Sequence, residues 1–380
     1  MQIRLNVVVG AVAALLSSAA MSQEAIVKIG HVGPTSGAIA HLGKDNELGA
    51  RLAIEELNAK GVMIGGKKVK FELLAEDDAA DPKQGTAAAQ KLVDSKVNGV
   101  VGHLNSGTSI PASKIYSDAG IPQISPSATA VEFTSRGLKN TFRVVANDGQ
   151  LGGTLGRYAA TTLKAKKVAV IDDRTAYGQG VAKEFEKGAK SSGATVVGHE
   201  FTTDKSVDFT TILTTLKAKN PDVVFFGGMD AVAGPMLRQM KQLGINAKFM
   251  GGDGICTGKL PELSSNTMAD GQVVCAEAGG VEGEAKKSMD DFRVKFKAKF
   301  NTDVQIYAPY VYDAVNVLVD AMVRAKSSDP AKYLPELAKT SGYKGVTGTI
   351  SFDPKGDIKN GSLTLYTYKA GAREQIAVVR

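Results

Sequence analysis

Three short segments of this 380-residue sequence carry polar side chains that could hold a small charged solute. Two of them, residues 102–108 and 125–129, are rich in small and hydroxyl-bearing residues. Free backbone N–H groups and hydroxyl donors at the start of a helix bind anions such as a carboxylate. The residues alone leave another interpretation open, in which Ser106 and Thr129 only cap their helices.

The third segment places an acidic residue, Asp253, between glycines. Glycine allows a backbone to approach a ligand closely, and an ionised carboxylate is a suitable partner for an ammonium group. Tyr177 could offer its ring face or its hydroxyl to the same cation, or it could simply pack. Asp253 could also be an ordinary turn residue, because turns favour Asp and Gly.

Short apolar runs alternate with stretches of helical periodicity around these segments, which predicts an α/β fold with a parallel sheet covered by helices. Strands are expected at residues 25–32, 70–75, 99–102, 122–125, 167–171, 195–197, 223–226 and 248–250. Helices are expected at residues 46–58, 178–191, 209–219, 232–243, 284–300 and 310–325, with one more starting at Asp81-Pro82. Ligands of open α/β sheets bind beyond the carboxyl ends of the strands, which is where the three segments stand.

The length of the chain predicts two domains, since one hydrophobic core rarely serves so many residues. A β-rich tail at residues 348–379 follows the late helices, so each lobe should be completed by a distant segment. We expect lobe 1 at residues 23–146 plus 276–350 and lobe 2 at residues 147–275 plus 351–380. Several crossings between the lobes would form a hinge that closes on a ligand.

The N-terminus has the pattern of a secretory signal peptide covering residues 1–22. Arg4 precedes an apolar stretch at residues 7–16, and a run of small residues ends at Ser22, where we expect cleavage. The apolar stretch is far shorter than the roughly 20 residues that span a bilayer. The mature protein is therefore expected to be exported.

Charge and cysteine content narrow the possible functions. The net charge of +7 comes from scattered cations with acidic residues between them, and tryptophan is absent. This argues against a nucleic-acid groove, which needs clustered cations and stacking aromatics. Cys256 and Cys275 are expected to form a disulfide in an oxidising compartment. A metal site is disfavoured, because no CxxC or HxxxH spacing accompanies them.

Across essentially its whole mature length, the sequence resembles the periplasmic branched-chain amino acid-binding proteins. The resemblance is carried, in order and spacing, by residues 29–37, 77–82, 102–106, 111–112, 125–129, 177–178 and 249–254. It implies the type I periplasmic-binding-protein fold, with two Rossmann-like lobes joined by three hinge crossings and a ligand cleft between them. It also implies that no cofactor is needed.

The resemblance assigns roles to individual residues. It implies that the ligand's α-carboxylate is held by Ser106 and by the loop of Ser127, Ala128 and Thr129. It implies that Tyr177 and Asp253 receive the ammonium group.

Departures from the family pattern put the ligand's side chain in doubt. Two positions that often carry aromatic residues hold Leu42 and Met229, and Asp253 stands where a glutamate is usual. The family's usual first-lobe disulfide is missing, because Ala80 and Asn105 occupy its positions.

We therefore expect a non-enzymatic periplasmic receptor that captures a branched-chain or other apolar amino acid. It would work as a monomer and deliver this ligand to the permease of an ABC transporter in the inner membrane. An amide, an aromatic acid or another carboxylic acid is the alternative ligand, although an acid without an amine would leave Asp253 unpaired. An exported hydrolase would need a GxSxG motif at its nucleophile and a histidine late in the chain. The sequence has no GxSxG motif and its last histidine is His199, so this alternative is disfavoured.

Overall fold

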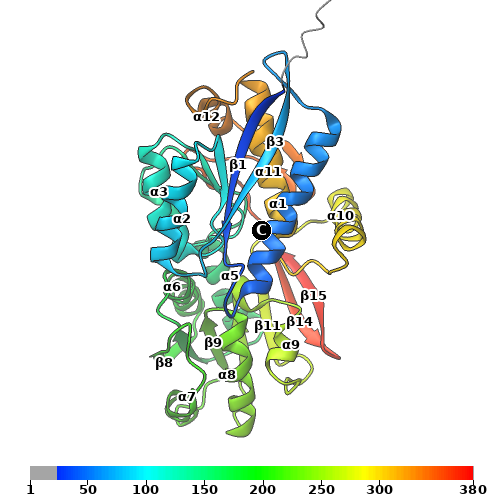
Figure 1. Cartoon of the computed structure of the whole chain (residues 1–380). Helices are drawn as coiled ribbons and strands as arrows, with labels where there is room; N and C mark the ends of the chain where they lie inside the picture. Colours follow the sequence, from blue (N-terminus) through cyan, green and yellow to red (C-terminus); the bar gives the residue numbers. More distant parts are fainter. Residues whose placement is uncertain (1–23, 380) are drawn as a thin grey trace, which may run out of the picture.

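The computed structural model describes residues 24–379, which form two α/β lobes stacked along the long axis of the molecule (Figure 1). The predicted signal peptide, residues 1–22, and its cleavage after Ser22 lie outside the described residues. Across residues 24–379, none of the helices combines the length and the apolar character needed to span a membrane.

The first lobe is built on a six-stranded sheet. Its strands lie in the order β2 (Met63–Ile64), β3 (Lys67–Asp77), β1 (Ala25–Gly33), β4 (Gly99–Gly102), β5 (Gln123–Ser125) and β6 (Thr141–Arg143). All neighbours pair in parallel except β2 and β3. Helices cover both faces, so central strand residues such as Ile29 and Val100 are fully buried, which explains the continuous apolar runs.

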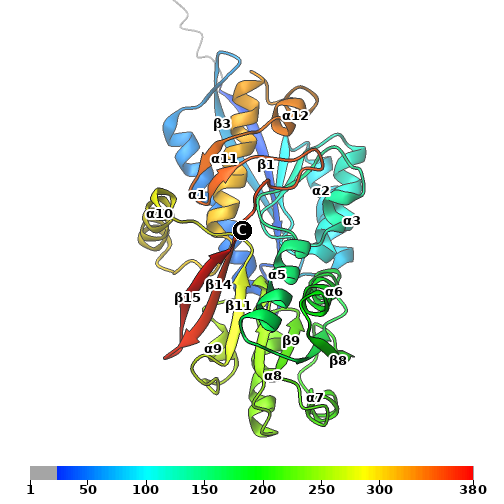
Figure 2. The same ribbon diagram turned by 180° about the vertical axis from the view of Figure 1, so that it is seen from behind.

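The second lobe is built on a seven-stranded sheet. Its order is β15 (Ala372–Val379), β14 (Leu363–Lys369), β11 (Val273–Glu277), β10 (Lys248–Gly251), β9 (Val223–Gly227), β7 (Lys167–Asp172) and β8 (Thr195–Phe201). The two C-terminal strands, β14 and β15, add to the parallel part in antiparallel fashion. Figure 2 shows them beside β11, so the chain's last segment completes the second sheet.

The helices follow the predicted alternation with the strands. Those packed on the first sheet are α1 (Ala40–Lys60), α2 (Pro82–Asp94), α3 (Ser106–Asp118), α4 (Glu132–Ser135) and α11 (Ala308–Arg324), and α12 (Pro330–Ala338) packs on α11. The second lobe carries α5 (Asp148–Thr161), α6 (Ala176–Ser191), α7 (Thr210–Lys217), α8 (Asp230–Gln242), a 3₁₀ turn (Asp253–Ile255) and α9 (Leu260–Leu263). Helix α10 (Glu284–Phe300) packs on α1 through Phe292 and Phe296, and a small ribbon joins β12 (Tyr343–Gly345) to β13 (Gly348–Ile350).

Three connections pass between the lobes: from β6 into α5, from β11 toward α10, and from β13 toward β14. The N–H of Ala146 donates to the carbonyl of Ala278 at 3.0 Å, and the N–H of Arg143 donates to the carbonyl of Gly356 at 2.9 Å. The three connections therefore lie side by side. The buried Arg143 guanidinium also donates to Asp357 at 2.5 Å, which ties the first connection to the third.

Candidate functional site

A small cavity, with a free volume of about 10 Å³, lies where the two lobes meet. Its walls are formed by Leu104, Asn105, Ser106, Ser127, Tyr177, Met229, Asp253 and Tyr307. That volume is about what one water molecule needs, so the two lobes are closed on each other here and must separate to admit a solute.

The first-lobe wall of the cavity favours an anion. Ser106 is the first residue of α3, and its Oγ accepts the N–H of Ala130 at 3.1 Å. Ser127 donates its hydroxyl to the carbonyl of Leu104 at 3.0 Å. Asn105 occupies the N-cap position of α3, yet within residues 24–379 its side-chain oxygen has no hydrogen-bond partner. The positive end of the α3 dipole thus borders the cavity.

The second-lobe wall of the cavity carries a carboxylate, that of Asp253. The Asp253 carboxylate is 1% exposed, and it accepts the hydroxyl of Tyr177 on Oδ1 and that of Tyr307 on Oδ2, both at 2.9 Å. Burial raises the pKa of Asp253 to about 6, and the two hydroxyl groups oppose this shift. Among residues 24–379, no lysine, arginine or histidine forms an ion pair with Asp253.

The ends of a strand and a helix position Asp253 and Tyr177 at the cavity. Strand β10 ends at Gly251, and the 3₁₀ turn begins at Asp253, so the carboxylate stands at the carboxyl end of a central strand. Tyr177 lies in the first turn of α6, whose N-cap Thr175 accepts the N–H of Gly178 at 2.9 Å. The N–H of Gly254 donates to the Tyr177 hydroxyl at 3.1 Å, which joins the two loops.

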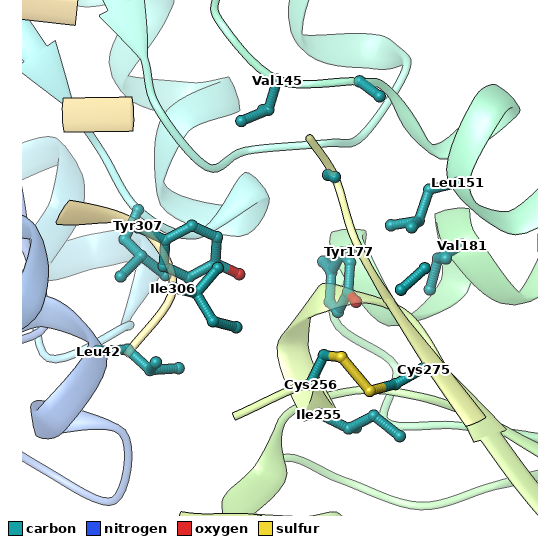
Figure 3. Packing of buried hydrophobic residues seen from close by; sticks show 14 of the residues in the cluster. Leu42, Val145, Leu151, Tyr177, Val181, Ile255, Cys256, Cys275, Ile306 and Tyr307 are labelled. Atoms are coloured by element: carbon teal, nitrogen blue, oxygen red, sulfur yellow. A yellow bond between two sulfur atoms is a disulfide. The ribbon is translucent and has the colours of Figure 1, made fainter. Parts of the chain in front are cut away.

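A disulfide supports the acidic turn. Cys256, directly after the turn, is bonded to Cys275 of β11, and their Cα atoms are 5.4 Å apart. Figure 3 shows this bond on the second-lobe side of the site, below Tyr177, while Tyr307 lies on the opposite side with its hydroxyl directed toward the second lobe. The bond fixes the end of the segment that carries Asp253.

A second contact joins the lobes next to the cavity. Nε2 of His41, in the first turn of α1, lies 2.8 Å from Oδ2 of Asp230, the first residue of α8. The His41 side chain is 21% exposed, whereas that of Asp230 is fully buried. Asp230 also accepts the hydroxyl of Thr257 at 2.6 Å. The two lobes are therefore in direct contact at this pair as well as at Tyr307 and Asp253.

The structure brings five of the sequence-predicted ligand residues together around the cavity: Ser106, Ser127, Tyr177, Met229 and Asp253. The other three, Leu42, Ala128 and Thr129, are buried beside it and are not among its described lining residues. Leu42 packs in the core on the first-lobe side (Figure 3). The carbonyl of Ala128 accepts Nη1 of Arg143 at 2.9 Å, which links the ligand loop to the hinge.

Tyr307 is the main cavity residue that the sequence reasoning missed. The predicted helix began at residue 310, whereas α11 begins at Ala308 with Pro309 in its first turn. Proline is favoured at that place, so Pro309 was the signal that would have put Tyr307 at a helix N-terminus. The pair formed by His41 and Asp230 left no comparable signal, because it joins residues 189 positions apart.

A polar cluster in the first lobe lies apart from the cavity wall. His103 is fully buried between Asp78 and Tyr116, with Nδ1 and Nε2 each 3.0 Å from a partner oxygen. Within the described part of the chain, no three His, Cys, Asp or Glu side chains gather in a way that could hold a metal ion.

Known proteins similar to this chain are named as amino acid-binding proteins. The chain is 35% identical over 346 residues to the leucine-, isoleucine-, valine-, threonine- and alanine-binding protein of Pseudomonas aeruginosa, with 91% of each chain covered. It is 34% identical over 372 residues to the leucine-specific-binding protein of Salmonella typhimurium, with 98% of each covered.

A solved structure shares the same architecture. The branched-chain amino acid transporter substrate-binding protein LivJ of Streptococcus pneumoniae, in complex with isoleucine, superposes with a TM-score of 0.84 at 30% identity. The match covers 93% of this chain and 99% of that one, which confirms the predicted two-lobed fold. The family model described as "Periplasmic binding protein" matches residues 26–373. This chain therefore belongs to the periplasmic binding protein family.

Proposed function

We propose that this protein is a receptor that captures a small α-amino acid with an apolar side chain between its lobes and presents it to the permease of an ABC transporter. The chain is exported to the periplasm with its signal peptide cleaved after Ser22, and it works there as a monomer without catalysing a reaction. The names of the two similar binding proteins and the isoleucine complex of a third support this proposal.

One observation carries the proposal: Asp253 is a buried carboxylate that lacks a cationic partner among residues 24–379. Burying an ionised carboxylate is costly unless a cation compensates it. The cavity beside it can hold such a cation only if the ligand brings one. An ammonium group fits, because Asp253 and the Tyr177 hydroxyl can both accept its N–H donors.

The rest of the cavity completes the recognition of an amino acid. The N-terminus of α3 and the hydroxyl of Ser106 face the position of an α-carboxylate, opposite Asp253. Leu104 and Met229 supply apolar surface for a side chain. Only the closed arrangement brings both walls to one ligand, so binding favours closure about the three connections. A micromolar affinity, about 8 kcal/mol, is within reach of such contacts.

A thermal-shift screen of refolded, ligand-stripped protein tests the proposal. The panel contains the standard L-amino acids, their amides and aromatic acids, and Asp253→Ala is measured alongside the wild type. A ligand that binds only the folded state raises the melting temperature. We expect stabilisation by one group of apolar amino acids that is lost in Asp253→Ala. A shift caused only by amine-free acids or by amides would move this protein to a different ligand class.

A further inference from the structure

The segment that leads into α11 brings Tyr307 to the cleft, and a residue of α1 holds that segment. The carboxylate of Asp45 accepts the backbone N–H groups of four consecutive residues at 2.8–3.2 Å: Gln305, Ile306, Tyr307 and Ala308. Tyr307 stands at the N-cap position of α11, but its hydroxyl donates across the cleft to Asp253. Asp45 therefore supplies from α1 the acceptors that the start of α11 requires.

The packing of α1 against α11 makes this contact possible. Asp45 is 3% exposed and lies one helical turn before Gly49. A Cβ atom at Gly49 would lie only 2.4 Å from the carbonyl oxygen of Ala308, so a larger residue there would push the helices apart. An ionised carboxylate is also favourable at the positive end of a helix. Asp45 is thus a rigid anchor rather than a mobile surface contact.

The described contacts form a continuous connection from the first lobe to the second. Asp45 fixes the backbone of Tyr307, and the Tyr307 hydroxyl reaches Oδ2 of Asp253, which is the carboxylate that faces the cavity. Asp45 itself is not among the described residues that line the cavity. The described route from Asp45 to the cavity therefore runs through Tyr307.

We propose that Asp45 is a positioning residue for ligand capture, which holds Tyr307 so that its hydroxyl orients Asp253 toward the ligand's ammonium group in the closed state. This inference rests on the proposed amino acid-binding function. Without Asp45, four backbone N–H groups lose their acceptor, the segment shifts, and Asp253 keeps only the Tyr177 hydroxyl. The closed, ligand-bound state then loses a lobe-to-lobe hydrogen bond.

The test is a double-mutant cycle of Asp45→Asn and Tyr307→Phe, read out as L-leucine affinity by titration calorimetry. Each single variant should weaken binding about 10-fold, the effect of one hydrogen bond to a charged group. The double variant should lie within about 2-fold of Tyr307→Phe alone, because Asp45 acts only through that residue.

The chain offers a matched control. Asp313 is also buried, and its carboxylate accepts the N–H groups of Val346 and Thr347, but it is not among the described residues that line the cavity. Asp313→Asn should lower the melting temperature and leave the affinity for L-leucine within 2-fold of the wild type. A general loss of stability is thereby separated from a loss of positioning.

A second readout needs no ligand. With 3-fluorotyrosine placed at position 307, the ¹⁹F resonance should shift or broaden in Asp45→Asn and stay unchanged in Asp313→Asn. Asp45→Glu, which keeps the charge but displaces the acceptor, replaces Asp45→Asn if the latter does not fold. Additive affinity losses in the double variant, or an unchanged ¹⁹F resonance, would overturn the inference. Failure of every amino acid to bind the wild type would instead refute the proposed function, and the ¹⁹F result would still decide the role of Asp45.

Discussion

Replacing Asp253 by asparagine should stabilise the ligand-free protein while it destroys tight amino acid binding. Burial raises the pKa of this carboxyl from 3.8 to about 6. A rise of that size means that, above pH 6, the ionised carboxylate lowers the free energy of unfolding by about 3 kcal/mol. Asparagine keeps the shape and removes the charge, so most of this cost should disappear at pH 8.

The same substitution removes the partner of the ligand's ammonium group. Truncating one side of a buried, hydrogen-bonded charge pair costs about 2–5 kcal/mol, which is roughly a 30-fold to several-thousand-fold loss of affinity. The wild type should show a related pH dependence. Its affinity should fall as the pH drops below about 6, because Asp253 must be ionised to pair with the ammonium group.

Two measurements on Asp253→Asn check this reasoning. Thermal unfolding without ligand should place the variant several degrees above the wild type at pH 8. The difference should shrink by pH 4.5, since a raised carboxyl pKa penalises the fold only where the unfolded chain has lost its proton. Calorimetric titration with L-leucine should show the affinity loss. A variant that is less stable at pH 8 and binds L-leucine like the wild type would refute the reasoning.

Further predictions concern the surroundings of the site. Burial raises the pKa of Asp148 to about 8, so the stability of the wild type should decline as the pH rises from about 4 to 8. Melting curves recorded across this pH range should show a smaller decline for Asp148→Asn. His41→Ala removes the lobe-to-lobe contact with Asp230, and stopped-flow measurements should show L-leucine leaving about 10-fold faster, whereas an unchanged rate would argue against a role in closure. Opening the disulfide with Cys256→Ser and Cys275→Ser should lower stability by about 3 kcal/mol in chemical denaturation, and equal stability would contradict this estimate.

Much of the fold could be predicted because buried parallel strands read as short apolar runs. Strand β4 has the predicted bounds, and β10 differs by one residue. Helix α5 was not predicted, because its glycines lower helix propensity while they allow close packing on α6. Helix α1 begins at Ala40 rather than at residue 46, since Gly43, Lys44 and Asp45 interrupt the apolar periodicity there.

The site was predictable to the extent that its residues follow strands. Asp253 and Ser127 stand two residues after the ends of β10 and β5, where ligands of α/β sheets bind. Tyr307 and Asp45 were not found, because their roles depend on how α1 packs against α11. A contact between residues 262 positions apart is set by tertiary packing and leaves no local pattern.

The central claim is that Asp253 recognises an ammonium group, and one comparison tests it most directly. Titration calorimetry of the wild type with L-leucine and with 4-methylpentanoate, the same acid without its amine, isolates that single group. We predict tight binding of L-leucine and a loss of at least 100-fold for 4-methylpentanoate. Equal affinities for the two ligands would contradict the claim.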